Sequence, residues 1–149
     1  MLIDLNKTVT RTGVWVNYLT DQKGPGGLGA SSNGSLTYQL AAAGNKTIVI
    51  ATSNKNSVLP VGYEFKFKVF VDDKLQGEAT ENKPFNIVVP TATSKLRIAW
   101  EGDYYVAGKF DANLLITSIN LTDANEVAAS MPLALLGAAA ALWFFVFRK

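Results

Sequence analysis

The chain has 149 residues, with 14 lysines and arginines against 12 aspartates and glutamates, and it has neither cysteine nor histidine. This composition excludes disulfides, thiolate nucleophiles, Cys/His zinc sites and histidine base catalysis. The terminal Arg148 and Lys149 carry the whole excess of positive charge. The rest of the chain is neutral, so it offers no electrostatic basis for binding nucleic acid.

The first predicted strand covers Thr8–Tyr18, which is rich in β-branched and aromatic residues. Its alternation places Val14, Val16 and Tyr18 on one face and Trp15 on the other. The glycines, proline and serines of the following segment, residues 23–34, predict a long flexible loop. Loops of this length in small domains are often functional. We therefore select a candidate contact loop, made of Gly24, Pro25, Gly26, Gly27, Leu28 and Gly29.

Short strands are predicted at Ser35–Leu40 and Thr47–Thr52, and the clearest alternation of the chain lies in Tyr63–Val71. A period of two indicates one face on a core and one in water. The core face is expected to carry Tyr63, Phe65, Phe67, Val69 and Val71. The water face is expected to carry Glu64, Lys66 and Lys68.

Five further strands complete the pattern, at Leu75–Thr80, Phe85–Val89, Leu96–Trp100, Tyr104–Val106 and Leu114–Leu121. Prolines on both sides confine Phe85–Val89 to a short or edge strand. The length and apolar character of Leu114–Leu121 favour a central position. Strands that are short, numerous and separated by turn residues predict an all-β fold, an antiparallel β-sandwich with jelly-roll topology, over residues 1–122.

The carboxylates form no convincing catalytic group. Asp72 and Asp73 are typical of a hairpin turn, because aspartate bonds to its own backbone there. Glu101 and Asp103, with Asp111 nearby, are too few and too generically spaced to predict a calcium site, which stays an alternative. We therefore predict a protein that is not an enzyme and has no cofactor or metal.

Aromatic side chains offer a second possible type of site. Four aromatic residues have two interpretations, a platform that stacks on sugars or packing in the core. They are Trp15, Trp100, Tyr104 and Tyr105.

The C-terminal segment has no charged residue from Val127 to Phe147. As a helix it would be about 31 Å long, which matches the hydrocarbon core of a bilayer. After a short polar linker, 123–126, we therefore predict a transmembrane helix at 127–149 with Arg148 and Lys149 as a basic tip. Gly137 and Ala141 form a small-xxx-small pair suited to helix packing. The predicted anchor residues are Val127, Pro132, Leu135, Leu136, Gly137, Ala141, Trp143, Phe144, Phe145 and Phe147.

Two observations give opposite orientations for this helix in the membrane. Basic residues usually stay in the cytoplasm, which would place the β domain outside. The first residues show neither the basic nor the apolar region of a secretory signal. Either a signal peptide is missing from this numbering, or the tail is inserted after synthesis. We expect the second, with the β domain on the cytosolic side and the basic tip across the membrane.

This architecture resembles the membrane-anchored, single-jelly-roll structural proteins of icosahedral phages with an internal membrane. The resemblance implies a minor capsid protein that links a protein shell to the internal membrane of a virion. Its implied partners are the lipid bilayer, further copies or other shell proteins, and nucleic acid or anionic lipid at the basic tip. No small-molecule substrate is implied.

The tail also resembles bacterial sorting signals of the PEP-CTERM kind, with Ser130-Met131-Pro132 where Pro-Glu-Pro is expected. This resemblance implies an alternative function. The chain would be a β-sandwich binding module at the cell surface, anchored or sorted by its tail, with a carbohydrate or protein ligand.

Overall fold

The computed structural model describes residues 1–17, 27–30, 32–53, 58–103 and 105–124. Two five-stranded antiparallel sheets face each other, and we name each after its central strand. The β9 sheet has the order β1 (Thr8–Thr12), β4 (Gly34–Gln39), β9 (Lys95–Trp100), β6 (Lys66–Val71), β7 (Lys74–Thr80). The β12 sheet has the order β2 (Trp15–Asn17), β3 (Leu28–Ala30), β12 (Leu114–Asp123), β5 (Gly44–Ser53), β8 (Phe85–Val89). A small hairpin joins β10 (Tyr105–Val106) to β11 (Phe110–Asp111).

The core lies between the two sheets and follows the alternation of their strands. In β6, Phe67 and Val69 are fully buried while Lys66 and Lys68 are exposed. Trp100 at the end of β9 pairs with Phe67 and is also fully buried. The antiparallel sandwich and the predicted inner face of residues 65–71 are therefore confirmed.

The central position predicted for the last strand is also confirmed. β12 pairs with β5 from Leu115 to Asp123, and on its other edge with β3. The sequence analysis missed a further contact of this strand: Ile3 N–H donates to Ile119 O at 2.9 Å, and Leu121 N–H donates to Met1 O at 2.8 Å. The first residues of the chain thus extend the β12 sheet before the chain crosses to β1.

Two local predictions are wrong. The strand expected at Thr8–Tyr18 divides at Gly13, whose φ is +80° and whose added Cβ would lie 2.4 Å from Asn33 O. The chain changes sheets at this glycine, because β1 belongs to the β9 sheet and β2 to the β12 sheet. Part of the segment expected to be a flexible loop, Leu28–Ala30, is instead the buried strand β3.

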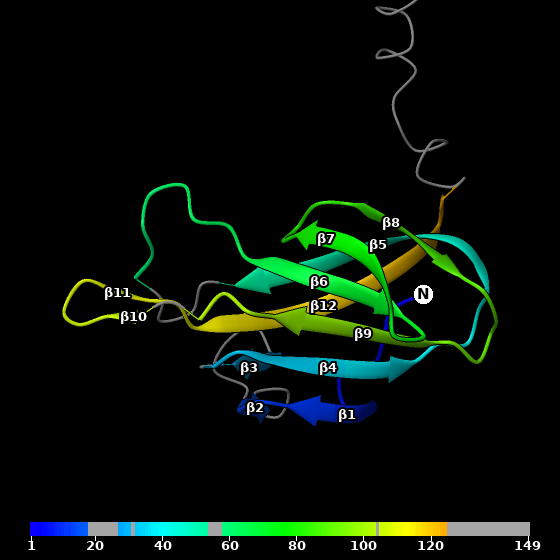
Figure 1. Cartoon of the computed structure of the whole chain (residues 1–149), viewed down its shortest axis with the longest axis horizontal. Helices are drawn as coiled ribbons and strands as arrows, with labels where there is room; N and C mark the ends of the chain where they lie inside the picture. Colours follow the sequence, from blue (N-terminus) through cyan, green and yellow to red (C-terminus); the bar gives the residue numbers. More distant parts are fainter. Residues whose placement is uncertain (18–26, 31, 54–57, 104, 125–149) are drawn as a thin grey trace, which may run out of the picture.

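The two ends of the sandwich differ (Figure 1). One end carries the β10–β11 hairpin, residues 58–65 and residues 101–103. The opposite end carries the β6–β7 turn at Asp72–Asp73, the N-terminus, and the end of β12, after which the described chain stops at residue 124. The described chain therefore stops at the end of the sandwich opposite the hairpin.

The predicted C-terminal features lie almost wholly outside the described residues. Asp123, expected in a linker, is the last residue of β12. The predicted transmembrane helix at 127–149 is not described. Within residues 1–124, as far as they are described, no helix is long and apolar enough to cross a membrane.

Tyr38 gives the fold a pH dependence. Its side chain is 1% exposed, and its hydroxyl has no hydrogen-bond partner among the described residues. Burial raises the pKa of this phenol far above 10, with a small opposite effect from Arg11. Because the native pKa exceeds the unfolded one, the stability contributed by Tyr38 is complete below pH 10 and is lost as the pH rises further.

We predict that Tyr38→Phe weakens the alkaline loss of stability. Above pH 10 the free energy of unfolding should fall less steeply with pH in the variant than in the wild type. The two slopes should differ by about 1.4 kcal/mol per pH unit, the contribution of one titrating group. At pH 7 the two proteins should be nearly equally stable, because the variant removes an unpaired buried hydroxyl. Urea unfolding at pH 7 and at several values above pH 10 measures both effects. Parallel pH profiles would contradict the prediction.

Lys46 and Asp123 join β5 to the end of β12. The Lys46 Nζ lies 2.5 Å from Asp123 Oδ1, and its side chain is only 10% exposed, whereas that of Asp123 is 59% exposed. We predict that Asp123→Ala lowers the free energy of unfolding by about 1–3 kcal/mol, because it leaves a buried ammonium without this partner. Lys46→Met should cost less, since no buried charge remains.

The exposed pair of Lys66 with Glu78 provides the control. Glu78→Ala should change the free energy of unfolding by at most about 1 kcal/mol, as exposed ion pairs do. Urea titrations of the three variants decide the order. Equal losses in the Asp123 and Glu78 variants would show that burial of Lys46 is unimportant.

Candidate functional site

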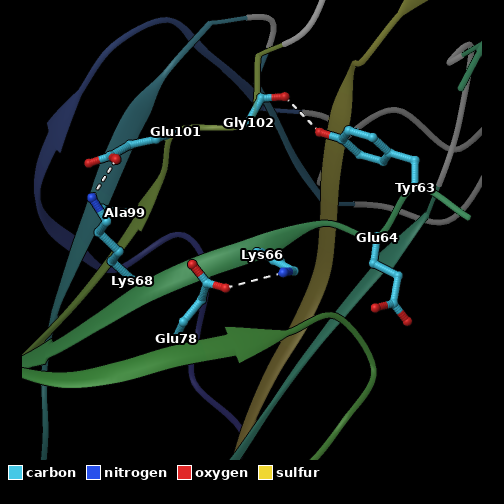
Figure 2. Close-up of a pocket in the computed structure, with 8 residues that line it drawn as sticks. All are labelled: Tyr63, Glu64, Lys66, Lys68, Glu78, Ala99, Glu101 and Gly102. Atoms are coloured by element: carbon cyan, nitrogen blue, oxygen red, sulfur yellow. Dashed lines mark hydrogen bonds and ion pairs between the residues drawn. The ribbon is translucent and has the colours of Figure 1, made fainter. Parts of the chain in front are cut away.

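A hollow lies on the outer face of the β9 sheet, near the hairpin end (Figure 2). It has a volume of about 350 Å³. Ala99 contributes the shortest side chain on this part of the face, between Lys68 of β6 and Ser35 of β4 in the register. Its small size leaves the space that the longer neighbours surround. The lining residues are Tyr63, Glu64, Lys66, Lys68, Glu78, Ala99, Glu101 and Gly102.

Cationic and anionic side chains alternate around this hollow. Lys66 Nζ lies 3.4 Å from Glu78 Oε1, and Lys68 Nζ lies 2.6 Å from Glu101 Oε2 (Figure 2). All four side chains are about half exposed. Exposed ion pairs contribute little to stability. The four side chains therefore matter more as hydrogen-bond donors and acceptors that face solvent.

Glu64 also lines the hollow and is already paired. Lys83 Nζ donates to Glu64 Oε1 at 2.6 Å. This hydrogen bond and the positive charge of Lys83 lower the pKa of the Glu64 carboxyl. Glu64 therefore stays ionised and is balanced by a lysine outside the lining.

Tyr63 forms a rim that is tied to the core. Its Oη donates to Gly102 O at 2.6 Å, and its ring packs edge-on against Phe65 at 5.3 Å. Phe65 in turn contacts Trp100, with ring centroids 6.0 Å apart. Burial raises the pKa of Tyr63, and the nearby Trp100 indole partly offsets this without meeting hydrogen-bond geometry. The rim thus stays neutral and rigid near pH 7.

The four aromatic residues singled out in the sequence do not form a platform. Trp100 is fully buried, and Trp15 is partly buried against the core, with Nε1 donating to Thr12 O at 2.7 Å. Tyr105 is 70% exposed at the hairpin end, and Tyr104 lies outside the described residues. The sugar-stacking interpretation is therefore wrong for Trp100, because its position in β9 faces the other sheet.

The aspartates predicted to form a turn do so. Asp72 and Asp73 have positive φ values of 48° and 61°, and Asp72 Oδ1 accepts a hydrogen bond from Lys95 N–H at 2.8 Å. That bond, with another to Ser94, lowers the pKa of the Asp72 carboxyl. Within the described ranges, no three acidic residues gather to hold a metal ion.

The candidate contact loop is only partly described. Gly27, Leu28 and Gly29 are buried, and Leu28 has no exposed surface. They cannot serve as an exposed contact element, which corrects the prediction for these residues. Gly24, Pro25 and Gly26 lie outside the described residues, as do the predicted membrane anchor and the basic tip at Arg148 and Lys149.

The sequence did not predict the hollow, although it did predict that two of its lining residues face water. The alternation in β6 placed Lys66 and Lys68 on the water face. The pairing of these lysines with Glu78 and Glu101 depends on the register between strands far apart in the chain. No local sequence pattern identified Ala99 as the residue at the bottom of the hollow.

Comparisons with known proteins establish a shared fold. No protein-family model matches the chain, and no curated protein sequence matches it. Among solved structures, a family 35 carbohydrate-binding module from an environmental isolate has a TM-score of 0.52 and 17% identity, covering 79% of this chain and 88% of its own. The CBM36-1 domain of a multidomain xylanase from the hindgut metagenome of Trinervitermes trinervoides has a TM-score of 0.54 and 13% identity, covering 83% and 97%.

A third similar structure is the CBM35 from Paenibacillus barcinonensis, with a TM-score of 0.51 and 13% identity over 83% of this chain and 99% of its own. The likeness is one of fold. These structures are carbohydrate-binding modules rather than capsid proteins, which contradicts the predicted function as a shell-to-membrane protein of a virion. It equally contradicts the predicted lipid, shell and nucleic-acid partners. The functional prediction was wrong because alternating short strands indicate a β-sandwich but do not indicate what the sandwich binds.

We predict that Gly102→Ala destabilises the rim of the hollow. An added Cβ would lie 2.6 Å from Trp100 Nε1 and 2.9 Å from Tyr63 Oη, and the Trp100 side chain is fully buried. The free energy of unfolding should fall by about 1–3 kcal/mol. Tyr63→Phe, which loses only the hydrogen bond, should cost about 0.5–1.5 kcal/mol. Chemical denaturation compares them, and an alanine variant as stable as the wild type would contradict this packing.

Proposed function

We propose that this chain is a non-enzymatic binding module of the β-sandwich class whose ligand is a saccharide, bound in the hollow over Ala99. The observation that carries the proposal is the alternation of ammonium and carboxylate groups around a small floor residue. The fold shared with carbohydrate-binding modules supports it. The strand order, in which the chain passes repeatedly between the two sheets, supports a single jelly roll.

The chemistry of the hollow suits a ligand rich in hydroxyl groups. Glu78 and Glu101 accept hydrogen bonds and Lys66 and Lys68 donate them, so one hydroxyl can meet both kinds of partner. Hydrogen bonds with an ionised partner are stronger than neutral ones. A volume of about 350 Å³ lies within the range of small-molecule sites.

The charge balance of the hollow favours a neutral ligand. The two lysines of the lining match Glu78 and Glu101, and Glu64 is matched by Lys83. Neither a polyanion nor a polycation would find an excess of opposite charge here. A neutral sugar unit, which offers only hydroxyls, fits this balance.

The position of the hollow suits display of the domain. It lies toward the hairpin end, whereas the described chain leaves at the opposite end after β12. Attachment through the C-terminal tail would hold the hollow away from the point of attachment. We propose surface display on this ground, with the domain attached or sorted through the residues that follow β12.

We predict that a larger side chain at position 99 weakens binding. Ala99→Leu should weaken affinity for neutral polysaccharide at least tenfold, because its side chain occupies the hollow. Affinity electrophoresis and calorimetry of the full-length chain against soluble glucans, mannans and xylans measure the effect. Absence of binding by the wild type to all of these would overturn the proposed function.

A matched control is available on the other sheet. Ala51 of β5 alternates with the buried Ile50 and faces outward from the β12 sheet. Ala51→Leu introduces the same side chain on the opposite face and should leave affinity unchanged. Equal losses in the two variants would place the site elsewhere.

A further inference from the structure

A second hollow lies on the same outer face of the β9 sheet, closer to the end where the described chain stops. Its volume is about 180 Å³. Thr10 of β1 and Thr37 of β4 contribute short side chains to it. The lining residues are Val9, Thr10, Thr37, Asp73, Lys95 and Arg97.

Strand β9 connects the two hollows. Its outward residues are Lys95 and Arg97 at the second hollow and Ala99 at the first, where Glu101 follows directly after the strand. At the rise of a β-strand, Arg97 and Ala99 are about 7 Å apart, and Lys95 and Glu101 are about 20 Å apart. An extended ligand lying along β9 would therefore reach both hollows.

The second hollow differs from the first in charge. Two cations, Lys95 and Arg97, face one carboxylate, Asp73, whose side chain is 92% exposed and lies 3.5 Å from Arg97 Nε. The neighbouring Asp72 is outside the lining, and its carboxylate accepts the backbone N–H of Lys95. An excess of one positive charge remains in the lining.

Arg97 is held in a defined orientation. Its guanidinium lies over the ring of Phe70 in the neighbouring strand β6, 3.7 Å from the ring centroid, and its side chain is 30% exposed. Stacking of this kind fixes the plane of the guanidinium. A planar guanidinium presents paired donors that match a carboxylate or another planar oxyanion.

Resting on the proposed function, we propose that the outer face of the β9 sheet binds one extended saccharide that carries an anionic substituent. The anionic group contacts Arg97 and Lys95 in the second hollow, while a neutral unit of the same chain occupies the first hollow. The shared chemistry is a carboxylate or sulfate ester on a sugar. A polymer charged at every unit, such as a nucleic acid, would place an anion against Glu101 and Glu78.

The test compares three hexasaccharides with the full-length chain by calorimetry at low ionic strength: a neutral one, the same one with a single uronate, and the same one with a single sulfate ester. The wild type should bind at least one charged form about tenfold more tightly than the neutral form. Comparison of the uronate with the sulfate identifies the anion. The advantage should shrink as salt is added.

Four variants assign the effect to the second hollow. Arg97→Gln and Lys95→Gln should each remove most of the preference for the charged form over the neutral form. Asp73→Asn should increase the preference severalfold, because it removes the competing carboxylate. Arg11→Gln changes a basic residue of β1 that does not line either hollow and should have no effect.

The outcomes separate the two proposals. Equal wild-type affinity for all three hexasaccharides, or a preference that survives both glutamine variants at residues 95 and 97, overturns this inference and leaves the proposed function intact. Tighter binding of a single-stranded oligonucleotide than of any hexasaccharide also overturns it. Binding of none of the probes overturns the proposed function, and this inference with it.

Discussion

The structure depends on the burial of alternate side chains between two sheets. Each inward residue of a strand forces the next one outward, so the packing of Phe67 and Trp100 in the core decides where Lys68 and Ala99 stand on the surface. The outer face of the β9 sheet is thus a consequence of its inner face. A slip of one residue in either strand would exchange core and surface side chains.

The candidate site arises from this registration across strands rather than from any one segment. β6 supplies Lys66 and Lys68, β7 supplies Glu78, and β9 supplies the floor at Ala99. The ion pairs contribute little to folding. Along β9, positive and negative charges balance at the first hollow, and positive charge is in excess at the second. This asymmetry would orient an extended ligand on the outer face of the sheet.

The comparison with solved structures changes the functional interpretation without changing the fold prediction. An antiparallel sandwich supports shells, receptors and binding modules alike, because its stability resides in the inner faces and its function in the outer faces and loops. The resemblance to capsid proteins rests on a compact β domain followed by an apolar segment with a basic end, and neither feature concerns the outer faces of the sheets. The similar solved structures share 13–17% identity with this chain, so the likeness concerns the fold and identifies no face of the domain.

The sequence by itself determined the strands whose alternation is clean and local. Residues 65–71, the edge strand Phe85–Val89 and the central strand from Leu114 were all predicted. Their local signals are period-two alternation in the first, flanking prolines in the second, and a long apolar run in the third. Only the tertiary structure decided that Leu28–Ala30 is a buried strand, that Met1–Ile3 extends the β12 sheet, and that Ala99 floors a hollow. These features depend on pairing between residues distant in the chain, which no local pattern records.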